Sequence, residues 1–285
     1  MAQIEIFART EIGNVRARNE DRFLVVNLAT GDRSLQPTAR IQTIGPAGTF
    51  LAVCDGMGGA AGGDVASGLA ADSLARVLRS HSPFASMDDA QEALLDSVRQ
   101  ANRTILEAAG RDGNLHGMGT TVTGALVFGP ELAIVHVGDS RAYLRRGRTF
   151  QQLTHDHSVV GQMVAAGRLT SEEARKIESR NVLLQALGVM PKVGPELVKT
   201  TLRAGDILML CSDGLTTPLS DAEVLELLLR YEDPMRCCRA LTEAACAAGG
   251  PDNITVLIAR FTGEGLEVPQ GREPIYIERR QVAVG

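Results

Sequence analysis

The chain has 285 residues, of which 44% are hydrophobic and 22% charged, so its composition is that of a globular protein and excludes a disordered chain. Its 29 lysines and arginines and 34 acidic residues give a net charge of −5, which excludes the basic footprint of a duplex-DNA-binding protein. No segment approaches the roughly 18 apolar residues that span a bilayer, and Met1–Arg9 alternates apolar and polar residues, unlike a secretion signal. We expect a cytoplasmic protein without membrane insertion or a nucleic-acid partner.

Strands are predicted where short apolar runs occur. Some runs are continuously apolar, such as Leu51–Cys54 and Ile207–Cys211, which is typical of strands that are covered on both faces. Glycine-containing turns at Gly129 and Gly147 predict antiparallel hairpins. The predicted strands are Ile4–Ala8, Phe23–Asn27, Thr49–Cys54, Thr120–Phe128, Leu132–Val137, Ala142–Arg145, Glu196–Leu202, Asp206–Cys211 and Asn253–Phe261.

Helices are predicted in three blocks between these strands. Apolar residues recur there at helical spacing, and Ser86, Thr170 and Ser220 each stand three residues before an acidic residue, as at a capped N-terminus. Pro234 suits a first helical position. The predicted helices are Asp64–Leu78, Ser86–Ala109, Ser158–Ala166, Thr170–Ile177, Ser220–Leu229 and Pro234–Ala248.

The order of these elements predicts the fold class. Antiparallel strands are interrupted by helix pairs at separate places, and the regular strand–helix alternation of a Rossmann fold is missing. We therefore expect an α+β sandwich, in which two sheets stack and helices cover their outer faces. The stretch 263–285 follows the last predicted strand and is expected to form a tail or an extra edge element.

Four aspartates stand close to glycines at the ends of predicted strands, namely Asp55, Asp139, Asp213 and Asp252. A strand fixes the chain direction and a neighbouring glycine permits a sharp turn, so the four carboxylates can face one place. Carboxylates brought together need raised pKa values or a bound cation, and oxygen ligands without histidine or cysteine suit Mg²⁺ or Mn²⁺. Each aspartate alone is better explained as an ordinary turn residue, and it is the set of four that favours a metal site.

A second polar segment, Gly13–Asp21, places Arg16 and Arg18 just before Glu20 and Asp21. A guanidinium fork suits a phosphate group. The alternative is a solvated charged turn, because surface charge runs are common.

Together these residues form an ordered set of motifs, with which the chain resembles the bacterial branch of the metal-dependent PP2C-type (PPM) protein serine/threonine phosphatases. Each motif alone is weak, but the shared order over roughly residues 8–261 is specific. The resemblance implies a four-layer αββα sandwich, with the phosphatase domain at 1–262 and a flap at about 156–181. The motifs are Arg16-x-x-Asn19-Glu20-Asp21, Asp55-Gly56-Met57-Gly58-Gly59, Gly117-Met118-Gly119-Thr120-Thr121, Gly138-Asp139-Ser140-Arg141, Leu153-Thr154-His155-Asp156-His157-Ser158, Gly205-Asp206 with Ser212-Asp213-Gly214, and Gly249-Gly250-Pro251-Asp252-Asn253.

The resemblance implies a set of metal ligands. Asp55 matches the ligand that bridges two tightly bound Mn²⁺ or Mg²⁺ ions, with the carbonyl oxygen of Gly56 on one of them. Asp213 and Asp252 match ligands of the other ion of the pair. Asp139 matches the position that holds a third, weaker ion in bacterial members.

The resemblance also implies roles around these ligands. Arg16 matches the arginine that binds the substrate phosphate. Glu20 and Asp21 match acids that hold metal-bound water or support the cluster, and Asn253 is assigned to the same supporting shell. The proton for the leaving group is expected from metal-bound water. His155 and His157 are the alternative donors, although a solvated turn that opens the flap explains them better.

The implied activity is the hydrolysis of phosphoserine and phosphothreonine in proteins, by in-line attack of a water that bridges the two ions. The expected partners are phosphorylated substrates of bacterial serine/threonine kinases, and the chain is expected to act as a monomer. The alternatives are a pseudophosphatase and a phosphoprotein-binding module dedicated to one regulatory partner. Asp55, Asp213, Asp252 and Arg16 argue against the first, because an inactive member would be free to lose them.

Overall fold

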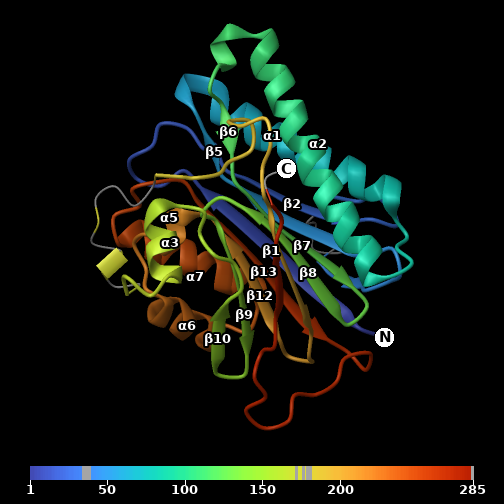
Figure 1. Ribbon diagram of the computed structural model, residues 1–285. Helices are drawn as coiled ribbons and strands as arrows, with labels where there is room; N and C mark the ends of the chain where they lie inside the picture. Colours follow the sequence, from blue (N-terminus) through green and yellow to red (C-terminus); the bar gives the residue numbers. More distant parts are fainter. Residues whose placement is uncertain (34–39, 171–172, 175–176, 178–181, 284–285) are drawn as a thin grey trace.

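Two antiparallel six-stranded sheets are stacked face to face, and helices cover the outer face of each (Figure 1). The structure, a computed structural model, describes residues 1–33, 40–170, 173–174, 177 and 182–283. The expected α+β sandwich with four layers is confirmed. Of the helix expected over 170–177, residues 171–172 and 175–176 lie outside the described residues.

The first sheet contains the strand nearest the N-terminus and the last long strand of the chain. The pair formed by these two strands runs in register from Gln3 opposite Thr262 to Glu11 opposite Ile254. Its strands, in spatial order, are β10 (Thr149–Gln152), β9 (Arg141–Arg146), β12 (Ile207–Cys211), β13 (Ile254–Thr262), β1 (Gln3–Glu11) and β3 (Ile41–Thr43).

The second sheet is built around a hairpin formed by its two central strands. The hairpin turns at Gly129, which has a φ of 58°, as the sequence predicts. A short ribbon of β5 (Gly56–Met57) and β6 (Gly119–Thr120) lies beside it. The six strands, in spatial order, are β14 (Glu278–Gln281), β11 (Glu196–Thr201), β8 (Glu131–Val137), β7 (Val122–Phe128), β4 (Thr49–Cys54) and β2 (Arg22–Asn27).

The helices form the two outer layers. Two long helices, α1 (Gly59–His81) and α2 (Met87–Arg111), pack on the second sheet, and η1 (Gly113–Leu115) follows them. The first sheet is covered by α5 (Asp213–Thr216), α6 (Asp221–Arg230) and α7 (Pro234–Ala247), with α3 (Val159–Ala165) nearby (Figure 1). In the described residues no helix is both long enough and apolar enough to cross a membrane.

Alternation along the strands explains their continuous apolar runs. In β4, Phe50 and Ala52 pack toward α1 and α2, whereas Leu51 and Val53 pack between the sheets. A strand with a sheet on one face and helices on the other has no solvent-facing positions, so both sets of side chains are apolar. The same pattern in β12 explains the buried Cys211, which serves as a small apolar residue.

The segment after β13 lies on the body of the protein. Leu266 and Ile275 are buried in the layer between the sheets, and β14 pairs with β11 at the sheet edge. Arg203 donates from Nε to Glu273 Oε1 at 2.8 Å, which adds an ion pair to the attachment.

Candidate active site

The four aspartates singled out in the sequence come together at one end of the sandwich. Asp55 follows β4 of the second sheet, and Asp139 follows β8 of the same sheet. Asp213 follows β12 of the first sheet, and Asp252 precedes β13. Because both sheets contribute, the cluster exists only where the two layers meet.

The electrostatics of the cluster reflect burial and mutual repulsion. Burial and the nearby carboxylates of Asp21 and Asp213 raise the pKa of Asp55 well above its usual value. Burial and Asp213 do the same to the pKa of Asp139, and burial and Asp252 raise the pKa of Asp213 to about 6. Such shifts mean that the site holds more negative charge than its protein surroundings stabilise.

Arg16 reaches the rim of this cluster from the loop after β1. Its Nη2 donates to Asp252 Oδ2 at 2.7 Å, and this contact raises the pKa of the guanidinium. The Arg16 side chain is 55% exposed, which leaves room for a further anion beside it. Arg16 thus lies in an exposed turn, as the alternative of a solvated charged segment expects, and is also ion-paired with Asp252; its binding of phosphate stays a prediction.

Asn253 holds the loop that carries Arg16. Its Nδ2 donates to the carbonyl oxygens of Ile12 and Arg18, both at 2.9 Å, and its Oδ1 accepts from Glu20 N at 2.8 Å. One buried amide thus fixes three points of the loop next to Asp252. The interactions give Asn253 a clear supporting position.

Glu20 and Asp21 lie behind the aspartates. Asp21 is 1% exposed, accepts from Ser212 Oγ at 2.7 Å, and has its pKa raised to about 7 by burial. The backbone of Glu20 packs so closely on Gly56 that a Cβ there would lie 2.6 Å from the Glu20 carbonyl oxygen. Position 56 therefore accepts glycine alone.

Hydroxyl groups fix the backbone on either side of Asp55 and Asp139. Thr121 Oγ1 accepts from Asp55 N at 2.9 Å and lies 2.8 Å from Ser140 Oγ. Gly138 has a φ of 116°, and a Cβ there would lie 2.5 Å from Thr121 Cγ2. Sequence reasoning missed Ser212 and the contact between Thr121 and Ser140, because hydroxyl pairing across strands leaves no local pattern.

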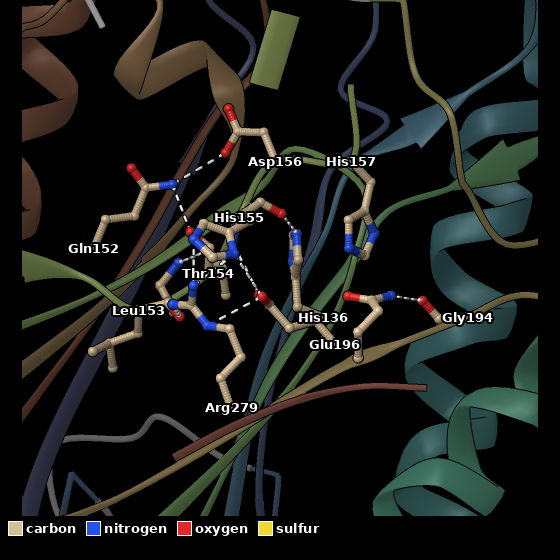
Figure 2. A network of polar contacts seen from close by, with 12 residues as sticks. His136, Gln152, Leu153, Thr154, His155, Asp156, His157, Gly194, Glu196 and Arg279 are labelled. Atoms are coloured by element: carbon tan, nitrogen blue, oxygen red, sulfur yellow. Dashed lines mark hydrogen bonds and ion pairs between the residues drawn. The ribbon is translucent and has the colours of Figure 1, made fainter. Parts of the chain in front are cut away.

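The segment His155–His157, here called the flap base, lies beside Asp139. Asp156 accepts from Arg141 Nη2 at 2.7 Å, and His157 N donates to Gly138 O at 2.6 Å. Gln152 Nε2 also donates to Asp156 Oδ1, at 3.2 Å (Figure 2). His157 is 8% exposed and burial lowers its pKa to about 4, so the expectation of a solvated turn is wrong for this histidine. A neutral imidazole with so low a pKa is a poor general acid at neutral pH.

A cavity of about 830 Å³ opens next to the carboxylates. Asp139 and Asp213 lie on one side of it, and α3, α5 and α6 supply small and apolar side chains such as Val160 and Ala222. Its volume is in the range of ligand-binding pockets and exceeds that of a phosphoserine side chain.

The residues present fit a divalent metal centre in their chemistry. Asp213 Oδ1 and Asp21 Oδ1 are both buried. Neither has a hydrogen-bond partner in the part of the chain that the structure describes. Buried carboxylate oxygens without a donor are suited to cations. Among the described residues, no three acidic, histidine or cysteine side chains are placed closely enough to hold a metal ion together.

Comparison with known proteins agrees with this geometry. A family profile described as protein phosphatase 2C matches residues 39–245. The serine/threonine protein phosphatase PstP of Mycobacterium tuberculosis is 38% identical over 258 residues, which are 88% of this chain and 44% of PstP. The serine/threonine phosphatase stp of Listeria innocua is 33% identical over 250 residues, which are 88% of this chain and 93% of stp.

The fold is shared with a solved structure of the catalytic domain of PstP in complex with two manganese ions. That structure is 35% identical, covers 92% of this chain and 100% of its own, and superposes with a TM-score of 0.74. This chain spans less than half the length of the Mycobacterium relative, but nearly all of the Listeria one. The chain therefore belongs to the protein phosphatase 2C family.

Proposed function

We propose that this protein is a metal-dependent phosphatase that hydrolyses phosphoserine and phosphothreonine in proteins. The observation that carries the proposal is the buried carboxylate cluster with the half-exposed Arg16 side chain at its rim. The relatives support it, because they are serine/threonine phosphatases and the PstP catalytic domain holds two manganese ions.

In this proposal, Asp55, the carbonyl oxygen of Gly56, Asp213 and Asp252 hold two Mn²⁺ or Mg²⁺ ions. Asp139 holds a third ion more weakly. When bound, the ions supply an activated water and neutralise charge on the phosphoryl oxygens. Asp21 and Glu20 sustain the negative potential behind these ligands, and burial also raises the pKa of Glu20.

The residues of the chain orient the substrate. Arg16 binds phosphoryl oxygens with the guanidinium N–H groups that Asp252 does not occupy. Asn253 holds the loop that carries Arg16 in place through its hydrogen bonds to that loop. The cavity beside Asp139 receives residues that flank the phosphoamino acid, because its size exceeds that of the phosphorylated side chain. Small residues that line the cavity, such as Gly161 and Ala222, leave room for a peptide.

We propose a bacterial cytoplasmic setting for this activity. The substrates are phosphoproteins made by bacterial serine/threonine kinases, and the protein works as a cytoplasmic monomer. The phosphatase domain comprises residues 1–262, the flap about 156–181, and 263–285 is an appendage to that domain. The bacterial relatives and the shared fold support this setting.

The test is hydrolysis of p-nitrophenyl phosphate and of a phosphothreonine peptide, with Mn²⁺, with Mg²⁺ and with excess chelator. Wild type should be active only with metal. Asp55→Asn should lose more than the roughly 10–100-fold that removal of an outer-shell partner costs. Asp96→Asn, the same change at an exposed position of α2, should be fully active.

Two outcomes would contradict the proposal. Activity that survives excess chelator would rule out the metal centre. Folded protein that binds the phosphopeptide but never hydrolyses it, with either ion, would instead favour a pseudophosphatase.

A further inference from the structure

Glu196 is a buried carboxylate outside the acidic cluster. It starts β11, and its side chain is 2% exposed. His155 N donates to its Oε2 at 2.9 Å, and His155 Nδ1 lies 2.9 Å from its Oε1. A buried charge is costly unless a cation and hydrogen bonds compensate it. The hydrogen bonds to Glu196 come from His155 in the flap base. A cation that pairs with Glu196 therefore also helps to hold the flap base.

The cation is Arg279 on the C-terminal strand β14. Its Nε lies 3.2 Å from Glu196 Oε1, and its Nη2 donates to Leu153 O at 2.7 Å. Its Nη1 lies against the His155 ring, close to both ring nitrogens. One planar guanidinium therefore touches Glu196, His155 and the backbone just before the flap base (Figure 2).

The other side of the flap base is attached to the active site. His157 N donates to Gly138 O at 2.6 Å, and Gly138 N donates back to His157 Nδ1 at 3.3 Å. Asp156 pairs with Arg141, two residues after Asp139. Five consecutive residues, 153–157, thus connect Arg279 on one side with Gly138 and Arg141, which stand before and after Asp139, on the other.

We propose that Arg279 is a positioning residue, which holds the flap base against the Asp139 turn through Glu196 and His155. The proposal rests on the proposed phosphatase function. It assigns the C-terminal strand a part in catalysis, although β14 contributes no residue to the carboxylate cluster. A guanidinium is required because a single ammonium cannot reach the carboxylate, the carbonyl oxygen and the ring together.

The chain offers a matched control on the same strand. Arg280 is the next residue, points to the other face of β14, and forms an exposed ion pair with Glu92 on α2. Arg279→Gln and Arg280→Gln therefore remove the same charge from adjacent positions, and only the first should affect the flap base. Arg279→Lys keeps the charge and is the second variant, should the glutamine variant fail to fold.

The first measurement is kcat and KM at saturating Mn²⁺, well below the melting temperature of each variant. Arg279→Gln should lose roughly tenfold in kcat on a phosphothreonine peptide, in the range of outer-shell substitutions. Its KM should change less, because the phosphate-binding Arg16 is untouched. Arg279→Lys should recover part of kcat, and Arg280→Gln should equal wild type.

The second measurement does not depend on activity. Hydrogen–deuterium exchange of the peptide spanning residues 153–157 should become at least about tenfold faster in Arg279→Gln, because its opening costs less free energy, and should not change in Arg280→Gln. Unchanged exchange together with unchanged kcat in both Arg279 variants would overturn the proposal. If Arg279→Gln exchanges faster but the wild-type protein hydrolyses no phosphopeptide, the positioning contact stands and the phosphatase function is rejected instead.

Discussion

Arg16 has two partners in the proposed active site, the Asp252 carboxylate and the substrate phosphate. In the structure it pairs with Asp252, and in the proposed mechanism it binds phosphate. Arg16→Ala should therefore raise KM for a phosphopeptide, with a smaller decrease in kcat, at a total cost of about 1.5–3 kcal/mol in kcat/KM. Steady-state kinetics with Arg33→Ala, an exposed arginine paired with Asp72, as the control will check this. Unchanged constants for folded Arg16→Ala would remove it from the site.

His157 predicts a dependence of stability on pH. Its folded-state pKa of about 4 lies below the usual 6.5, because burial disfavours the charged ring. Above pH 6.5 neither state is protonated. As the pH falls from 6.5 to 4, the unfolded chain takes up a proton that the folded chain does not, so stability decreases, by up to about 3 kcal/mol.

The measurement is the free energy of unfolding from pH 7 to 4 for wild type and His157→Asn. The asparagine oxygen can still accept from Gly138 N but carries no titratable group. The variant should lose less stability over this range than wild type does. Parallel pH profiles would mean that His157 titrates normally in the folded protein.

At the scale of elements, helix α6 provides a test of a capping box that the sequence predicts and the structure confirms. Ser220 Oγ accepts from Glu223 N at 3.3 Å, and the Glu223 carboxylate accepts from Ser220 N at 2.7 Å. Ser220→Ala should lower the free energy of unfolding by about 1 kcal/mol. Ser220→Asp, which restores an acceptor, should recover most of this loss in chemical denaturation. Equal midpoints for all three proteins would contradict the assignment.

The elements that sequence reasoning found are those whose formation depends on buried apolar side chains. The runs at Thr49–Cys54 and Ile207–Cys211 predict their strands almost to the residue, because both faces are covered. Strand β14 reads Glu-Arg-Arg-Gln and has no apolar signal. It forms because the edge of β11 offers backbone partners, which is information about tertiary structure.

The same distinction applies to the site. The four aspartates could be predicted because a strand end next to glycine is a local pattern. The ion pairs of Arg141 with Asp156 and of Arg279 with Glu196 join residues from different elements, and no spacing rule connects them. Only the packed sheets determine which charges meet.

The whole molecule should respond to metal through its stability as well as its activity. Mn²⁺ that binds the folded state alone adds about 2.7 kcal/mol at a hundredfold excess over its Kd, which is a rise in Tm of roughly 5 °C or more. Chelation should reverse the rise. Without metal, Asp213→Asn should melt higher than wild type, because one of the repelling carboxylates is gone, and it should respond weakly to Mn²⁺.

Differential scanning fluorimetry of both proteins, with and without Mn²⁺, decides this. Equal Mn²⁺ responses of wild type and Asp213→Asn would show that the ion binds elsewhere.

The pairing of β1 with β13 has a consequence for how the chain folds. Nine residues near the N-terminus find their partners about 250 residues later, in the middle of the first sheet. During synthesis β1 can pair with β3 early, but it cannot pair with β13 until residues 254–262 have been made, and contacts of such long sequence separation form slowly. The same late event brings Asp252, which directly precedes β13, to the aspartates of the second sheet. A nascent chain that stops short of Asp252 and β13 therefore lacks both a central strand of the first sheet and one of the four aspartates of the cluster.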